Sequence, residues 1–256
     1  MTGFLPDFPG AEVRVSPNFG PRRDEARPDT IILHYTGMKT GADAEAWLCA
    51  SESEVSSHYL VHEDGRVVQM VRESDRAWHA GRSSWQGVSD INSRSIGIEI
   101  VNPGIDGGLP EFPGIQISAV IDLCRDISAR HGIEKERVLA HSDVAPGRKV
   151  DPGPRFPWRA LARAGVGHFA QPAPLFATAG CGVGARGERV ELLQSLLQLY
   201  GYDVDISGIF DDRTRIVVEA FQLHFRQERI DGVADSETLG ILHALLEMLP
   251  LRSSTS

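Results

Sequence analysis

The sequence has few cysteines, no long apolar run and no excess of positive charge. Its three cysteines, Cys49, Cys124 and Cys181, are odd in number and widely spaced, which fits neither a disulfide framework nor a CxxC metal site. No stretch approaches the roughly 18 consecutive apolar residues of a membrane-spanning helix. The net charge of -9 gives no basic field to attract DNA, RNA or anionic lipid. Neither nucleic acid nor a membrane is therefore an expected partner.

The first residues also lack the basic and apolar regions of a secretory signal peptide. The expected location is the cytoplasm, with the periplasm or cell envelope as the alternative if a leader has been removed. Hydrophobic residues make up 41% of the chain and charged residues 24%, which is typical of globular proteins and argues against disorder.

The pattern along the chain predicts two domains of different character. Residues 1–165 alternate strand-like and helix-like segments, as in an α/β or α+β domain. The expected elements are strands over 30–35, 95–101 and 137–140, a hairpin over 58–71, and helices over 43–49 and 117–131. After His141 the repeated Pro and Gly predict an irregular loop. Residues 166–186 are rich in Gly, Ala and Pro and are expected to form a linker.

Residues 187–250 are predicted to form a small all-α domain of three helices, followed by a tail over 251–256. The first helix is expected over residues 188–200. The stretches that begin at Gly208 and Gly232 repeat a turn followed by a helix that an aspartate caps, Asp211 in one and Asp235 in the other. A domain of this size has little room for a buried active site, so a binding role is expected.

Candidate catalytic residues lie in three short segments, ILHYT, SIGIEIVN and LAHSDVAPGRKVDPG. His34, His141 and Asp151 provide two imidazoles and one carboxylate, which together can hold a catalytic Zn²⁺ and leave its fourth position open. Glu99 and Lys149 would then supply a base for water and a cation for developing negative charge.

Each of these residues also has a purely structural interpretation when it is taken alone. A histidine at the end of a strand is more often structural, and Asp151 could simply begin the turn at Pro152. Glu99 could face solvent, and Lys149 could be an ordinary surface lysine. The zinc hypothesis therefore depends on the combination. His58 and His62 are rejected as a metal pair, because four residues of strand span about 13 Å.

The segments ILHYTG, AWHAG, SIGIEIVNPG and AHSDVAPGRKVDPGPRFPW resemble the type 2 zinc amidases, the N-acetylmuramoyl-L-alanine amidase family. The resemblance implies an α/β fold with a mixed central sheet and flanking helices. It implies that His34, His141 and Asp151 bind zinc, that Glu99 is the catalytic acid and base, and that Lys149 assists the transition state. Tyr35, Trp78 and His79 are the candidate substrate-binding residues, although His79 could equally pack at a loop.

The implied reaction is hydrolysis of the amide between N-acetylmuramic acid, including its 1,6-anhydro form, and L-alanine of the stem peptide, in peptidoglycan turnover or recycling. The expected partners are peptidoglycan fragments or muropeptides. Residues 187–250 resemble a peptidoglycan-binding helical domain, but have Asp211-Asp212 and Asp235-Ser236 where that domain often has Gly-Pro. Two alternatives remain open, a non-catalytic peptidoglycan receptor and a zinc endopeptidase that cuts within the stem peptide.

Overall fold

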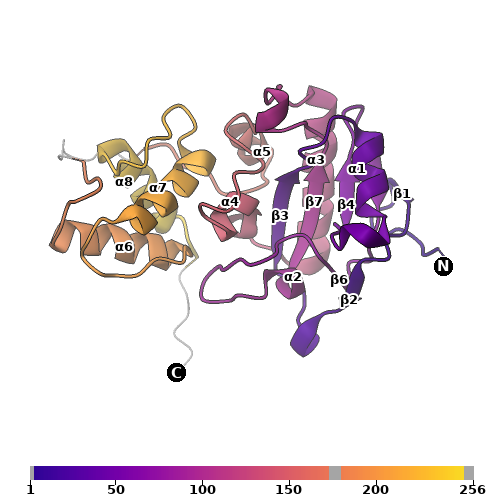
Figure 1. The fold of residues 1–256 in the computed structure, drawn as a ribbon, viewed down its shortest axis with the longest axis horizontal. Helices are drawn as coiled ribbons and strands as arrows, with labels where there is room; N and C mark the ends of the chain where they lie inside the picture. Colours follow the sequence, from indigo (N-terminus) through magenta and orange to yellow (C-terminus); the bar gives the residue numbers. More distant parts are fainter. Residues whose placement is uncertain (1–2, 173–179, 251–256) are drawn as a thin grey trace.

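A computed structural model describes residues 3–172 and 180–250, which form a sheet-based domain followed by a small helical domain (Figure 1). The strands are β1 (Ala11–Val13), β2 (Phe19–Pro21), β3 (Thr30–Tyr35), β4 (Tyr59–Val61), β5 (Val67–Gln69), β6 (Asp75–Ala77), β7 (Ser95–Ile100) and β8 (Val138–Ala140). The α-helices are α1 (Gly41–Leu48), α2 (Ile91–Arg94), α3 (Gly114–His131), α4 (His141–Val144), α5 (Trp158–Arg163), α6 (Glu188–Tyr200), α7 (Asp212–Phe225) and α8 (Ser236–Glu247). Short 3-10 helices cover Arg23–Glu25, Ser51–Ser53, Ile105–Gly107 and Lys135–Arg137. Residues 173–179 of the expected linker and the expected tail 251–256 lie outside the described residues.

The central sheet is mixed and has six strands in the order β1-β5-β4-β7-β3-β8. The hairpin partners β4 and β5 are antiparallel, and every other neighbouring pair is parallel. The expected mixed sheet with flanking helices is therefore confirmed. Because β3, β7 and β8 are parallel, their carboxyl ends meet at one edge, and the functional candidates lie at or just beyond these ends.

One face of the sheet is closed by a continuous apolar core. Successive side chains of a strand point to opposite faces, so Ile31 and Leu33 of β3 share a face with Ile96 and Ile98 of β7. The apolar stripe of α3 packs on this face together with Trp158 of α5. Both strands therefore place their polar side chains on the other face.

Apolar side chains cover the other face at its two ends. The helix α1 packs with Leu60 of β4 and Val68 of β5 at one end. At the other end, Ile32 of β3 and Leu139 of β8 join a core that continues into the helical domain. The middle of this face carries His34 and, opposite it on β7, Glu99. The fold thus leaves a gap over the polar residues.

The helical domain contains α6, α7 and α8, as the sequence predicts. The carboxylates of Asp211 and Asp235 accept hydrogen bonds from the backbone N–H of Thr214 and Thr238, so both predicted caps are confirmed. The first residues of the expected linker pack against this domain, because the buried His168 contacts the hydroxyl of Tyr200 at 3.0 Å.

The irregular loop predicted at the Pro and Gly residues after His141 is confirmed between α4 and α5. His141 begins the single helical turn α4, and α5 starts directly after Pro157. Backbone hydrogen bonds from Ala145 to His141 and from Arg148 to Ala145 order this turn and the residues immediately after it. Within the described ranges, no helix has the length and apolar character needed to cross a membrane.

Candidate active site

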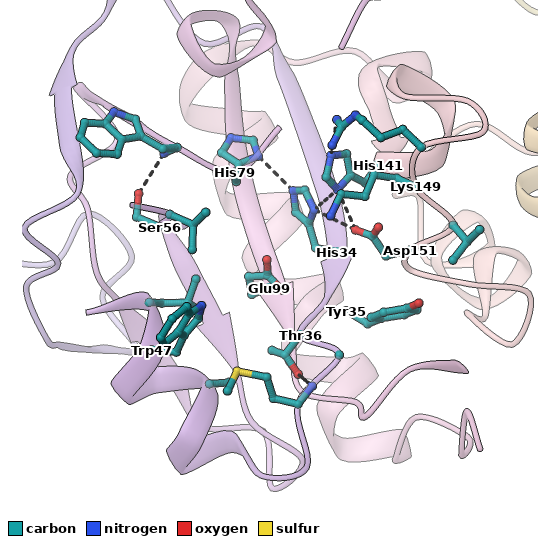
Figure 2. A pocket seen from close by; sticks show the side chains of 18 residues that line it. His34, Tyr35, Thr36, Trp47, Ser56, His79, Glu99, His141, Lys149 and Asp151 are labelled. Atoms are coloured by element: carbon teal, nitrogen blue, oxygen red, sulfur yellow. Dashed lines mark hydrogen bonds and ion pairs between the residues drawn. The ribbon is translucent and has the colours of Figure 1, made fainter. Parts of the chain in front are cut away.

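The three predicted metal ligands come together at the carboxyl ends of the parallel strands. His34 lies near the end of β3, His141 begins α4 directly after β8, and Asp151 lies in the following loop. Their residues are only 1%, 2% and 6% exposed. Nδ1 of His34 is 2.9 Å from Nδ1 of His141 and 3.0 Å from Oδ2 of Asp151. Nδ1 of His141 is in turn 2.9 Å from Oδ2 of Asp151, so the three atoms form a triangle (Figure 2).

A chain of hydrogen bonds fixes the tautomer of His34. The hydroxyl of Ser95 donates to the carbonyl of Ile91 at 2.7 Å, so its oxygen accepts from Nε2 of His79 at 3.1 Å. Nδ1 of His79 is then unprotonated and accepts from Nε2 of His34 at 3.0 Å. As a result, Nδ1 of His34 presents a lone pair to the triangle.

The backbone fixes the tautomer of His141 in the same sense. Nε2 of His141 donates to the carbonyl of Ala80 at 3.0 Å, which leaves Nδ1 unprotonated. Ala80 is held in turn, because its N–H donates to the side-chain oxygen of Asn92 at 2.8 Å. An outer hydrogen bond of this kind is what orients a metal-binding histidine.

The triangle therefore consists of two imidazole lone pairs and a carboxylate oxygen with no proton between them. Three acceptors at this spacing repel one another unless a cation lies among them. Burial and the neighbouring His141 lower the pKa of His34 to about 4, so its neutral, ligating form is favoured at neutral pH. The three residues fit a metal ion.

Glu99 is the strongest candidate for proton transfer. It points from β7 into the gap below His34 and His79, and its Oε2 atom is buried with no hydrogen-bond partner among the described residues (Figure 2). Burial, and then the negative charge of Asp151, raise its pKa well above the usual range, while Lys149 lowers it. From the sequence, the side chain of Glu99 could have faced solvent. In the structure it points into the cavity that the metal ligands line.

Lys149 lines the same cavity, which has a volume of about 420 Å³. It takes part in no ion pair with any described residue, and it lies beside Asp151 (Figure 2). Its ammonium group is therefore free to face a negative charge that forms in the cavity.

The candidate substrate-binding residues also line the cavity, but they differ in how freely a ligand could contact them. Tyr35 and Trp78 are partly exposed. His79 is 9% exposed and both of its ring nitrogens bind protein atoms, so its contact with His34 is its main structural role here. Substrate contact by these residues stays a prediction.

Several residues of the site were not identified from the sequence. Ser95 and Asn92 support the histidines through hydrogen bonds, and Trp47 of α1 forms the opposite wall of the cavity with 47% of its surface exposed (Figure 2). Ser95 and Asn92 carry no local signal, because serine and asparagine near a strand are common. An exposed Trp47 on an amphipathic helix is a signal that the sequence does contain.

Comparison with known proteins agrees with this geometry. Residues 24–154 match the N-acetylmuramoyl-L-alanine amidase family, and residues 186–242 match a peptidoglycan-binding domain family. The chain is 40% identical over 235 residues to the N-acetylmuramoyl-L-alanine amidase AmiD of Escherichia coli, covering 86% of this chain and 83% of that protein. It is 31% identical to the 1,6-anhydro-N-acetylmuramyl-L-alanine amidase AmpD of E. coli, in a match that covers 58% of this chain and 88% of that protein.

Solved structures show the same likeness. The complex of E. coli AmiD with anhydro-N-acetylmuramic acid-L-Ala-D-γ-Glu-L-Lys superposes with a TM-score of 0.73 at 39% identity, covering 91% of this chain and 92% of that one. AmpDh3 of Pseudomonas aeruginosa in complex with anhydromuramic pentapeptide superposes with a TM-score of 0.71 at 31% identity, covering 93% of this chain and 96% of that one. With its ligand triangle and family match, the chain belongs to the N-acetylmuramoyl-L-alanine amidases and carries a C-terminal peptidoglycan-binding domain.

Proposed function

We propose that this amidase is zinc-dependent and hydrolyses the amide between 1,6-anhydro-N-acetylmuramic acid and L-alanine of soluble muropeptides. The observation that carries the proposal is the buried triangle of His34, His141 and Asp151, with an unpartnered Glu99 carboxylate beside it among the described residues. Relatives that align along more than nine-tenths of this chain were solved with anhydromuropeptides bound, which supports the substrate class.

The donor set favours zinc over other common ions. Two imidazoles and one carboxylate are a typical catalytic zinc set, whereas Mg²⁺ and Ca²⁺ prefer oxygen ligands. Ligand atoms held tetrahedrally at about 2.0–2.2 Å from zinc lie roughly 3.3–3.6 Å apart. The observed separations of 2.9–3.0 Å need only a small outward movement to match. When bound, zinc supplies a Lewis acid and makes a water nucleophile available near neutral pH.

The protein side chains supply the proton transfers and charge stabilisation. Glu99 accepts the proton of the attacking water and returns it to the leaving amine, and its raised pKa makes its carboxylate a stronger base than an exposed one. Lys149 places a positive charge near the carbonyl oxygen as negative charge develops there. Tyr35, Trp78 and the exposed face of Trp47 line the cavity that would receive the substrate. No covalent intermediate is needed.

The test is mass spectrometry of the products from a defined 1,6-anhydromuropeptide, with and without a zinc chelator. Release of the whole stem peptide beginning at L-alanine, abolished by chelation and restored by zinc, is the expected result. A shorter peptide would identify an endopeptidase. An unchanged substrate with zinc bound would indicate a receptor or a requirement for intact wall. The cytoplasmic location expected from the sequence stays a prediction.

A further inference from the structure

A buried carboxylate links the helical domain to the metal ligand His141. Asp143 lies two positions after His141 in α4, and its side chain has no exposed surface. Oδ2 of Asp143 accepts the backbone N–H of Ala140 at 2.8 Å, which closes the turn that begins at His141. Neither zinc binding nor proton transfer by Glu99 uses this carboxylate.

The other partners of Asp143 come from the helical domain. The hydroxyl of Tyr202 donates to Oδ1 at 2.6 Å, and Nδ1 of His224, on α7, lies 2.7 Å from Oδ2. His224 is itself fixed, because its ring stacks between Trp158 and Phe225 with centroid distances of 3.7 and 3.8 Å. A buried carboxylate is costly unless such partners satisfy it, so the turn depends on the second domain.

A second contact joins the helical domain to the segment that follows Ala80. Trp85 lies in the segment that follows Ala80, whose carbonyl accepts from the His141 ring. Trp85 packs so closely on Gly201 that an added Cβ there would lie 2.4 Å from the indole. The N–H of Gln86 also donates to the carbonyl of Gly201 at 2.8 Å. The helical domain therefore contacts both the turn that begins at His141 and the segment that follows Ala80.

We propose that the C-terminal domain completes the amidase site, with Tyr202 and His224 as positioning residues that hold Asp143 and, through it, the turn presenting His141. This inference rests on the proposed function, since it treats His141 as a zinc ligand. It adds a role for the domain beyond the wall binding that its family suggests.

Two tyrosines of the helical domain provide a matched experiment in the full-length protein. Tyr202→Phe removes only the hydroxyl that donates to Asp143, and leaves Oδ1 without its partner. Tyr200→Phe removes an equally buried hydroxyl that contacts His168 instead. The zinc dissociation constant is measured by competition with a chromophoric chelator, together with kcat, KM and the thermal midpoint.

We expect Tyr202→Phe to weaken zinc binding about 10-fold, the lower end of the range for residues that support metal ligands. Tyr200→Phe should bind zinc as the wild type does, even where both variants lose thermal stability. At saturating zinc, Tyr202→Phe should lower kcat more than it changes KM. Equal zinc affinities for the two variants would overturn the inference, because a merely structural hydroxyl would give that result.

Variants of His224 test the second partner independently. His224→Leu leaves Asp143 with one donor fewer, whereas His224→Asn places an amide N–H near the position of Nδ1. Zinc affinity should fall in the leucine variant and recover in the asparagine variant. If the leucine and asparagine variants have the same zinc dissociation constant, His224 has no positioning role. A wild-type protein that neither binds zinc nor releases the stem peptide would instead refute the proposed function, so the two failures are distinguishable.

Discussion

The imidazole of His79 lies directly against Gly97, so that a Cβ atom added to Gly97 would be 2.5 Å from Cγ of the ring. His79 holds the tautomer of His34, and Gly97 is the neighbour of Ile32 in the sheet register, two residues before Glu99. The glycine in the SIGIE segment therefore makes room for the residue that orients a metal ligand.

Replacement of Gly97 by alanine should displace His79 and break its contact with His34. We expect zinc affinity to fall by about 10-fold or more, as it does when a residue behind a metal-binding histidine is lost. Chelator competition measures the effect. Gly114→Ala is the matched control, because Gly114 is exposed at the start of α3 and an added Cβ meets nothing within 4 Å. Unchanged zinc affinity in Gly97→Ala would show that His79 does not support His34.

Replacement of Glu99 by glutamine should separate catalysis from metal binding. The amide keeps the shape of the side chain but cannot accept the proton of water, so turnover should fall by at least about 100-fold. Zinc content should stay at the wild-type level, because Glu99 is not one of the ligands. Stopped assays with a defined muropeptide and metal analysis measure the two effects. Normal turnover with normal zinc would remove Glu99 from the mechanism.

Replacement of His141 by alanine should abolish zinc binding and activity together. The loss removes one of three protein ligands and leaves two, too few for a stable catalytic site. His243→Ala is the control, because the side chain of His243 is 49% exposed on α8. Metal analysis after dialysis gives the result, and one zinc per chain retained in His141→Ala would refute the ligand assignment.

Acid stability should depend on Glu73, which is not one of the metal ligands. Burial alone raises the pKa of this carboxyl, but hydrogen bonds from Arg130, Tyr59 and His131 outweigh burial and lower it to about 2. Because the folded pKa lies below the unfolded value of about 4.5, the contribution is complete above pH 4.5 and disappears as the pH falls toward 2. Above pH 4.5, the lowered pKa of Glu73 contributes about 3 kcal/mol to the free energy of unfolding.

Glu73→Gln should therefore lower the free energy of unfolding near pH 6 and differ less from the wild type with each step toward pH 2. Urea denaturation at a series of pH values measures this convergence. Glu111→Gln, at an exposed carboxyl, serves as the control. A constant difference between Glu73→Gln and the wild type across this range would contradict the assignment.

The sequence by itself determined the longer elements and identified the candidate ligands. The apolar run of residues 30–35 predicted a strand that the structure places at Thr30–Tyr35, and residues 188–200 predicted the helix α6, because these patterns are local. The aspartate caps before α7 and α8 are equally local. His34, His141 and Asp151 were identified because their neighbouring residues carry a family signature.

Only the tertiary structure decided how those ligands are oriented and what supports them. The turn α4 was missed because four residues are too few to show a helical period, and His224 carried no signal, since its partner Asp143 lies 81 residues away. The contact between His34 and His79 joins the end of one strand to a loop after another. Such pairs depend on the register of β3, β7 and β8 and on the packing of α7 against α4, which bring distant segments together and which no local periodicity encodes.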